Sequence, residues 1–271
     1  TSLDQDLRLC REVRAASGAP VAILGSQVTY TPGEVFEREN VDVVVRGEPE
    51  LTVLEVAQRV AAGRDLRGVL GTSWRVPTSP VAPGANGKPE IVHEAEREKI
   101  PDLDALPIPA RHLLRNEAYR FPGLAGPVTT VKSSRGCPLD CSFCGYTLAQ
   151  GLRFRFRSPA HVLSELVDLH RNHGLRHVVF RDPIFTTRKD RVKEICEGIV
   201  REKLDLEWQC ETAVKTLDRP LVEAMAKAGC KHISLGVESG NVEVQKNHCG
   251  SKLLDGKKTA NVFTVSTCAS R

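Results

Sequence analysis

The second half of the sequence repeats one unit, in which a short apolar run is followed by an amphipathic helix. Such connections place successive strands parallel in one sheet, because each helix carries the chain back to the edge where the strand began. The pattern therefore predicts a parallel barrel or part of one, with its chemistry at the carboxyl ends of the strands. A closed barrel would need more strands than this chain supplies. The predicted strands cover 128–131, 177–180, 206–210 and 232–237.

Capping residues mark the helices between these strands. Ser158 and Pro159 open the first helix, and residues 188–203 form the second. Asp218 caps a third helix that begins near Pro220. Serine and aspartate side chains accept hydrogen bonds from the free N–H groups at a helix start, and proline is tolerated in the first turn.

The first half of the chain also has an alternating α/β pattern. We expect an amphipathic helix over 2–17, buried strands over 20–24 and 41–45, and a helix that runs from Pro49 to about Gly63. Short continuous apolar runs are typical of parallel strands that are buried on both faces. Strand and helix thus alternate as in a doubly wound fold.

A hairpin and a proline-rich linker separate the two patterned halves. Two strands are expected around a Pro/Gly-rich turn, and three prolines then fall within nine residues and break all periodicity. The strands are 68–76 and 90–96, and the prolines are Pro101, Pro107 and Pro109. The expected divisions are 1–75 for a first α/β domain, 76–126 for the hairpin and linker, 127–244 for the partial barrel and 245–271 for a tail without core periodicity.

Composition limits the classes of protein to which the chain can belong. A chain of 271 residues forms one or two domains, and its net charge of +4 is spread along the chain, which gives no indication of a DNA partner. No apolar run approaches the roughly 20 residues of a transmembrane helix, and no signal peptide is evident. We therefore expect a cytoplasmic protein. Its start at Thr1 and its single methionine suggest a fragment.

Three of the nine cysteines lie within eight residues, in the loop after the first barrel strand. Cys137, Cys141 and Cys144 form the spacing C-x3-C-x2-C. Three thiolates so close in sequence can hold one side of a [4Fe–4S] cluster and leave one iron without a protein ligand. That iron could bind the amino and carboxylate groups of S-adenosylmethionine (SAM). The alternative is a zinc site, but zinc requires four ligands and no second cysteine pair lies at a suitable spacing.

Several sequence strings resemble the radical SAM superfamily, and in particular its cobalamin (B12)-binding subgroup. The resemblance lies in RGCPLDCSFC, RFRSP, FRDPIFT and ISLGVESGN, together with AILGS, DVVVRGEPELT and PDLDALPIPARHLL earlier in the chain. It implies a partial Rossmann-like cobalamin-binding domain followed by a partial (β/α) radical SAM barrel. It also implies reductive cleavage of SAM to a 5′-deoxyadenosyl radical, a small-molecule substrate, and an electron donor such as flavodoxin or ferredoxin. The family includes methyltransferases and tetrapyrrole cyclases.

Candidate SAM-binding residues follow from the resemblance and from the strand ends. The resemblance places the Phe143 backbone near the adenine, with a core aromatic residue as the alternative. Asp182 and Glu211 end the second and third strands, where each could contact the ligand or serve as a cap or ion-pair partner. Gly236, Glu238 and Ser239 end the fourth strand and could bind an ammonium or a ribose. Related sequences often carry an arginine where this chain has Ala213.

The resemblance also suggests residues that could contact cobalamin. These are Gly25 and Ser26 after the first strand, and Gly47 and Glu48 after the second. A turn that caps the following helix explains the second pair nearly as well. The family's Asp-x-His-x-x-Gly motif, which supplies the lower ligand of cobalamin, is absent from this sequence.

Two alternative functions are also compatible with the sequence. Arg153, Arg155 and Arg157 alternate with Phe154 and Phe156, which fits a strand with its aromatic side chains inward and its arginines outward. Aromatic and basic residues interleaved in this way can also bind RNA, so a tRNA-modifying radical SAM enzyme is one alternative. The other is an inactive, truncated gene product.

Overall fold

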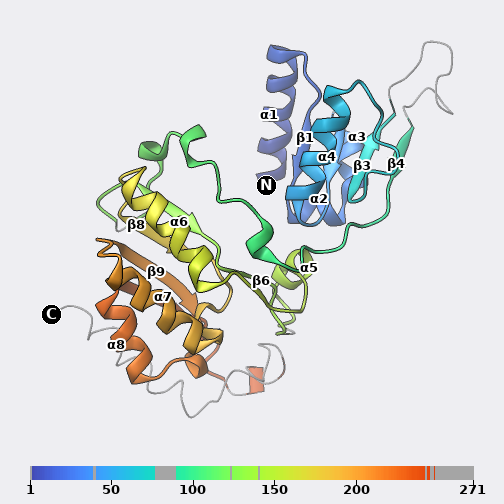
Figure 1. Cartoon of the computed structure of the whole chain (residues 1–271). Helices are drawn as coiled ribbons and strands as arrows, with labels where there is room; N and C mark the ends of the chain where they lie inside the picture. The colour runs from blue at the N-terminus through green and yellow to red at the C-terminus, as the bar shows by residue number, and fades with distance from the viewer. Residues whose placement is uncertain are drawn as a thin grey trace. The chain divides into compact units, whose positions relative to one another are not determined.

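The computed structural model describes residues 2–38, 41–76, 90–122, 124–139, 141–241, 243–244 and 247. The chain divides into two compact units, one made of residues 1–100 and 148–150, the other of residues 101–147 and 151–271. Figure 1 shows the helices and strands of both units. The predicted α/β fold class is confirmed. In the described residues, no helix combines the length and the apolar character that a membrane span requires.

The first unit is built on a four-stranded sheet with the order β1-β2-β3-β4. Strands β1 and β2 are parallel, whereas β3 and β4 each pair antiparallel with the strand before them. The strands are β1 (Ala22–Leu24), β2 (Val43–Val45), β3 (Thr72–Arg75) and β4 (Ile91–His93), and the helices are α1 (Ser2–Ser17), α2 (Ser26–Tyr30), α3 (Pro32–Arg38) and α4 (Pro49–Ala61).

The apolar run of β2 is continuous because both faces of the strand are buried. Val44 packs on one face with residues of α1, α2 and α3, such as Leu7 and Val35. Val43 and Val45 pack on the other face with Val56 of α4 and with Trp74 of β3. Both faces of this sheet are therefore covered, as in a doubly wound fold.

The second unit contains a parallel sheet with the order β10-β9-β8-β5. Helices α6, α7 and α8 follow β7, β8 and β9 in the chain (Figure 1). The strands are β5 (Val128–Val131), β6 (Ser134–Arg135), β7 (Arg155–Phe156), β8 (His177–Phe180), β9 (Glu207–Thr212) and β10 (Cys230–Leu235), and the helices are α6 (Pro159–Arg171), α7 (Lys189–Arg201) and α8 (Arg219–Lys227). The short helix α5 (Tyr146–Gln150) lies between β6 and β7 in the chain. Short 3-10 turns lie at 103–105, 111–113, 116–118, 185–187 and 214–216.

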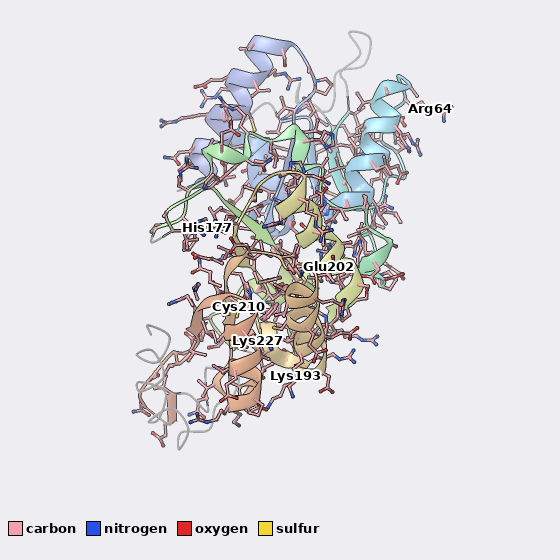
Figure 2. All side chains as sticks on the ribbon, turned by 60° about the vertical axis from the view of Figure 1, so that its left-hand side comes forward. Arg64, His177, Lys193, Glu202, Cys210 and Lys227 are labelled. Carbon is pink, nitrogen blue, oxygen red and sulfur yellow. The ribbon has the colours of Figure 1, made fainter. Side chains whose placement is uncertain are left out.

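One face of the parallel sheet is covered by helices, and the opposite face carries the polar side chains of β9, at Glu207, Gln209 and Glu211. Alternate residues of β9, such as Trp208 and Cys210, pack into the main core with α6, α7 and α8. Glu211, next to Cys210, is exposed on the opposite face. Figure 2 shows Cys210 on its strand, and Lys193 and Lys227 on the helical layer. The sequence-derived caps are confirmed, since the Ser158 and Asp218 side chains accept hydrogen bonds from the N–H groups of His161 and Leu221.

The prediction that Arg157 points outward is wrong. Only two residues of the Arg/Phe segment, Arg155 and Phe156, form a strand, and Arg157 is buried. A buried guanidinium needs partners, and Arg157 donates to the carboxylate of Glu165 on α6. The ring of Phe156 lies within cation–π range of the Arg188 and Arg191 guanidinium groups. These contacts use Arg157 and Phe156 internally, so these two residues give the RNA-binding alternative no support.

Candidate functional site

The cysteine loop leaves the carboxyl end of β5 and is closed at its base by a short antiparallel ribbon. Ser134 and Arg135 of β6 pair with Phe156 and Arg155 of β7. The N–H of Arg157 also donates to the carbonyl of Ser133 at 3.0 Å. The segment with all three cysteines is therefore held between two paired strands, and its ends are fixed relative to the sheet.

The Arg191 side chain of α7 binds both ends of the loop. Its guanidinium donates to the carbonyl of Arg157 and to the carbonyl of Ser133, each at 2.8 Å. Arg191 is only 5% exposed, and burial lowers the pKa of its guanidinium. A planar group with several donors can bridge two carbonyls in this way, which a lysine ammonium on a flexible stem does less well.

Asp182 follows β8 and holds the loop from the other side. Its carboxylate accepts hydrogen bonds from the Ser133 N–H at 3.2 Å, from the Ser133 hydroxyl at 2.9 Å and from the Ser134 hydroxyl. The side chain is fully buried, and this burial raises the pKa of its carboxyl. Asp182 does not line the pocket described below, so this geometry gives its predicted contact with SAM no support. Asp182 instead anchors the loop through its hydrogen bonds with Ser133 and Ser134.

A buried ion-pair network is centred on Glu165 and includes Arg157, at the end of the loop. Glu165 of α6 is 1% exposed and receives both Arg157 and Arg111, with Arg111 at 3.0 Å. Arg111 also donates to the Thr129 hydroxyl and to the Thr130 carbonyl of β5. The Glu165 carboxylate thus joins Arg111, before β5, to Arg157, at the end of the loop, and Arg111 in turn binds β5.

The loop's first glycine is required by a close backbone approach. Gly136 has φ +83°, and a Cβ at this position would lie 2.0 Å from the Arg153 carbonyl oxygen. The next residue, Cys137, donates its N–H to the Gly151 carbonyl at 3.0 Å. Any larger residue at 136 would push the two sides of the loop apart at the first cysteine.

The three cysteines differ in exposure. Cys137 is 7% exposed and packs with Ile184 and Ala213, whereas Cys141 and Cys144 are half-buried. Burial raises the pKa of the Cys137 thiol, the Leu139 N–H lowers it, and the nearby Cys144 raises it. Within the described ranges, no three His, Cys, Asp or Glu side chains approach closely enough to enclose a metal ion. Asp140, between the cysteines, lies outside the described residues.

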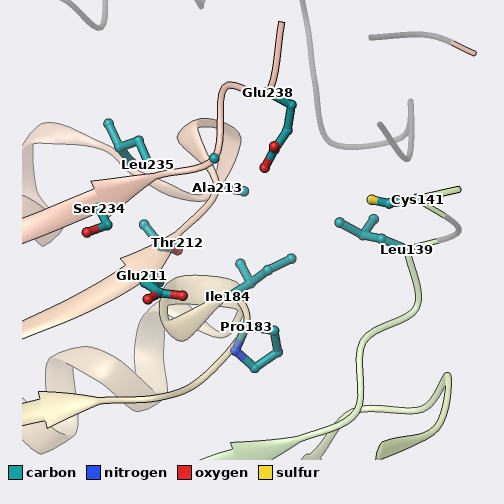
Figure 3. Close-up of a pocket in the computed structure, with 11 residues that line it drawn as sticks. Leu139, Cys141, Pro183, Ile184, Glu211, Thr212, Ala213, Ser234, Leu235 and Glu238 are labelled. Atoms are coloured by element: carbon teal, nitrogen blue, oxygen red, sulfur yellow. The ribbon is translucent and has the colours of Figure 1, made fainter. Parts of the chain in front are cut away.

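The donor set itself fits an iron–sulfur cluster. Three thiols lie on one loop whose two ends are anchored, and thiolate sulfurs are the usual protein ligands of such clusters. Cys141 also lines a pocket of about 320 Å³ that faces the carboxyl ends of β9 and β10. Figure 3 shows Cys141 and Leu139 on one side of this pocket, with Glu238 and Ala213 across from them. The lining residues are Leu139, Cys141, Pro183, Ile184, Glu211, Thr212, Ala213, Ser234, Leu235, Gly236 and Glu238.

The pocket brings together some of the residues predicted to bind SAM. Gly236, Glu238 and Glu211 line it, while Ser239 does not. Glu211 forms an ion pair with Arg181 at 3.0 Å, and both side chains are about half exposed. Phe143 is 60% exposed, so its interpretation as a core aromatic residue is wrong. Its contact with adenine remains a prediction.

Sequence patterns did not point to Thr212, Ser234 or Tyr146. Thr212 lines the pocket, and its hydroxyl lies 2.5 Å from that of Thr186, which in turn lies 2.5 Å from that of Thr216. Ser234 is the register partner of Glu211 and lies beside it on β10. Alternation along β10 could have indicated Ser234, which is two residues before Gly236 and so shares its face, but not Thr212, which shares the core face of β9 with Cys210.

Tyr146 is the first residue of α5 and lies two positions after the last cysteine, Cys144. Burial raises the pKa of its hydroxyl to about 12, and the neighbouring Asp182 and Cys137 contribute to this increase. The Lys132 ammonium lies 5.6 Å from the centre of its ring. Tyr146 is thus a neutral hydrogen-bond donor beside the cysteine loop.

In the first unit, the residues suggested for cobalamin lie at the carboxyl ends of the parallel strands β1 and β2. The Thr29 hydroxyl donates to the Gly25 carbonyl at 2.7 Å and accepts from the Gly47 N–H at 3.1 Å, so it joins the two turns. Gly25, Ser26 and Gly47 are exposed. No described atom lies within 4 Å of where a Cβ would stand at either glycine, which leaves room for a large ligand against the backbone.

Glu48 differs from its neighbours in this turn. It occupies the N-cap position of α4 and makes no side-chain capping bond. Its carboxylate is buried and accepts a hydrogen bond from the Ile100 N–H at 2.9 Å. The geometry therefore supports a structural role for Glu48 rather than contact with a corrin.

Comparisons with known proteins identify relatives of this chain. The model of the Radical SAM superfamily matches residues 131–255. An uncharacterized methyltransferase of Pyrococcus horikoshii is 35% identical over 256 residues, which cover 92% of this chain and 53% of that protein. The anaerobic magnesium-protoporphyrin IX monomethyl ester cyclase of Rubrivivax gelatinosus is 29% identical over 213 residues, which cover 77% of this chain and 36% of the cyclase. The chain thus spans about half the length of the first relative and less of the second.

A solved structure shares the fold. The radical S-adenosylmethionine methyltransferase TsrM from Kitasatospora setae, determined with cobalamin and a [4Fe–4S] cluster bound, has a TM-score of 0.68 at 19% identity, covering 94% of this chain and 49% of that chain. The superfamily match begins at the last residue of β5 and includes all three cysteines. The resemblance inferred from the sequence motifs is therefore confirmed, because residues 131–255 of the chain carry a radical SAM superfamily domain.

Proposed function

We propose that this chain is part of a cobalamin-dependent radical SAM enzyme that methylates or oxidatively cyclises a small organic substrate. The observation that carries the proposal is the cysteine loop at the carboxyl end of β5, with Cys141 in the wall of the pocket. Cys137, Cys141 and Cys144 would hold a [4Fe–4S] cluster. When bound, the cluster supplies the electron for reductive cleavage of SAM, and a flavodoxin or ferredoxin is the class of protein that would reduce it.

The polar groups of the pocket suit the polar parts of SAM. The Glu238 carboxylate can accept hydrogen bonds from an ammonium or from ribose hydroxyls, and Ser234 and Thr212 add hydroxyl groups at the ends of the neighbouring strands. Gly236 permits close approach of the ligand to the backbone. Leu139 and Ile184 provide apolar walls that limit access of water to the reacting groups.

Cobalamin binding is supported by the turns of the first unit and by the family of relatives. Gly25 and Gly47 are exposed, are joined by Thr29 and have open space in front of them. The relatives include proteins named as methyltransferases and as cyclases. A corrin held at these turns would supply or accept the methyl group in the methyltransferase version of the proposal.

Cluster assembly provides the first test. The full chain is reconstituted anaerobically with iron and sulfide, and iron content, absorption and paramagnetic resonance are measured. Cys137→Ala should lose the cluster and the formation of 5′-deoxyadenosine from SAM under dithionite. Cys10→Ala is the matched control, since Cys10 lies on α1 in the first unit. Wild-type protein that binds zinc, or no metal, would refute the proposal.

Cobalamin binding is tested separately by titration with hydroxocobalamin, followed by corrin absorption. Gly47→Ala should weaken binding, because a methyl group would project into the open space at the turn. Gly63→Ala is the matched control, because Gly63 has a similar positive φ, 64° against 72°, and equally open surroundings after α4. Equal binding by both variants would remove Gly47 from the proposed site.

A further inference from the structure

The Tyr146 hydroxyl is a buried polar group that the proposed function does not use. Its oxygen is shielded from solvent, and no hydrogen-bond partner is found for it among the described residues. Most buried hydroxyls in native proteins are paired, and an unpaired one costs stability and requires a physical explanation. Tyr146 is fixed in sequence only two residues after Cys144, so its position is tied to that of the cysteine loop.

The surroundings of Tyr146 point to the first cysteine. The tyrosine packs against the small cluster formed by Cys137, Ile184 and Ala213. The Cys137 sulfur already accepts one hydrogen bond, from the Leu139 N–H. A thiolate in such a buried position requires more than one donor, because desolvation disfavours the charge and hydrogen bonds to a charged acceptor offset that cost.

We infer that the Tyr146 hydroxyl donates a hydrogen bond to the Cys137 sulfur when that sulfur is a cluster-bound thiolate. This inference rests on the proposed cluster-binding function. Hydrogen bonds to cluster sulfurs are among the factors that set reduction potential. A donor at this sulfur stabilises the reduced state, which carries more negative charge, and so raises the potential. Tyr146 is thus a positioning residue that acts through Cys137.

The test compares Tyr146→Phe with wild type in the full chain, before and after anaerobic reconstitution. Tyr119→Phe is the matched control, because the Tyr119 side chain is 52% exposed and lies outside the loop. The first measurement is the melting temperature without iron. Tyr146→Phe should leave it equal or higher, since the change removes an unpaired buried oxygen and no contact.

The second measurement is the midpoint potential of the assembled cluster, from a redox titration followed by paramagnetic resonance. Tyr146→Phe should lower the potential, by up to about 59 mV if the equilibrium constant for one-electron reduction falls tenfold, and Tyr119→Phe should not. An unchanged potential in a variant with wild-type iron content would overturn the inference and leave the proposed function intact. A raised potential would also overturn it, because water entering the site would stabilise the reduced state. Failure of wild-type protein to assemble a cluster would refute the proposed function and this inference together.

Discussion

The buried carboxylate of Asp182 accepts hydrogen bonds from both the backbone N–H and the hydroxyl of Ser133, at 3.2 and 2.9 Å. Ser133 lies between the end of β5 and the cysteine loop, and its carbonyl is held by Arg191. Asp182, after β8, therefore binds the donor groups of Ser133, and Arg191, on α7, binds its carbonyl. These hydrogen bonds from β8 and α7 fix the backbone four residues before the first cysteine, Cys137.

The folding stability should depend on the ionisation of Asp182. Because the folded-state pKa of this carboxyl is raised by burial, the folded protein binds the proton more tightly than the unfolded chain. The contribution is therefore fully present below the unfolded pKa, near 3.8, and is lost as pH rises through the higher folded pKa. The free energy of unfolding of wild type, from urea titrations at a series of pH values, should decline over this window relative to Asp182→Asn. A parallel pH dependence in the two proteins would contradict this prediction.

Gly136 should tolerate no side chain. Gly136→Ala places a Cβ 2.0 Å from the Arg153 carbonyl oxygen and at positive φ, so the loop must shift at Cys137. We expect little cluster to assemble, measured as iron and sulfide bound per chain. Gly145→Ala is the control in the same loop, because no described atom lies within 4 Å of its Cβ position and its φ is negative. Similar cluster content in the two variants would show that the close approach does not position the loop.

Glu165 should be the most costly of the buried charges to remove. Glu165→Gln leaves Arg111 and Arg157 without their carboxylate, and breaking a buried ion pair on one side costs about 3–5 kcal/mol. Urea unfolding should show a loss of this order. Glu197→Gln on the exposed face of α7 should change stability by less than about 0.5 kcal/mol. A loss of under about 1 kcal/mol for Glu165→Gln would mean that water or other groups compensate the two arginines.

Glu238 should contribute to SAM binding without contributing to cluster assembly. Its carboxylate lines the pocket on the side opposite Cys141 (Figure 3). Loss of a charged hydrogen-bond acceptor costs about 1.5–3 kcal/mol, so Glu238→Gln should weaken SAM binding at least about tenfold in equilibrium dialysis of the reconstituted protein. Glu243→Gln, at an exposed position further along the chain, is the control. Unchanged SAM affinity in Glu238→Gln would place the ligand elsewhere.

The sequence alone was sufficient to predict the main strands and the longer helices, whereas the short helices α2, α3 and α5 were not predicted. Apolar runs such as 177–180 have few alternatives to a buried parallel strand, and Ser158 and Asp218 mark helix starts by a local hydrogen bond. The three cysteines are likewise recognised by spacing, because their function depends on residues close in sequence. The superfamily match covers all three cysteines, and their role as cluster ligands stays a prediction.

Only the tertiary structure decided which strand-end residues face the pocket and which hold the loop. Asp182 and Glu211 both follow or end strands. The Asp182 carboxylate is buried and accepts hydrogen bonds from the Ser133 and Ser134 hydroxyls, whereas Glu211 lines the pocket. Arg157 was expected on the surface and instead pairs with Glu165, eight residues later. The physical reason is that burial and ion pairing depend on which elements pack together, and these contacts join residues such as Ser133 and Arg191 that are 58 positions apart. Local patterns specify the elements, while the partners of buried polar groups are specified only when those elements meet.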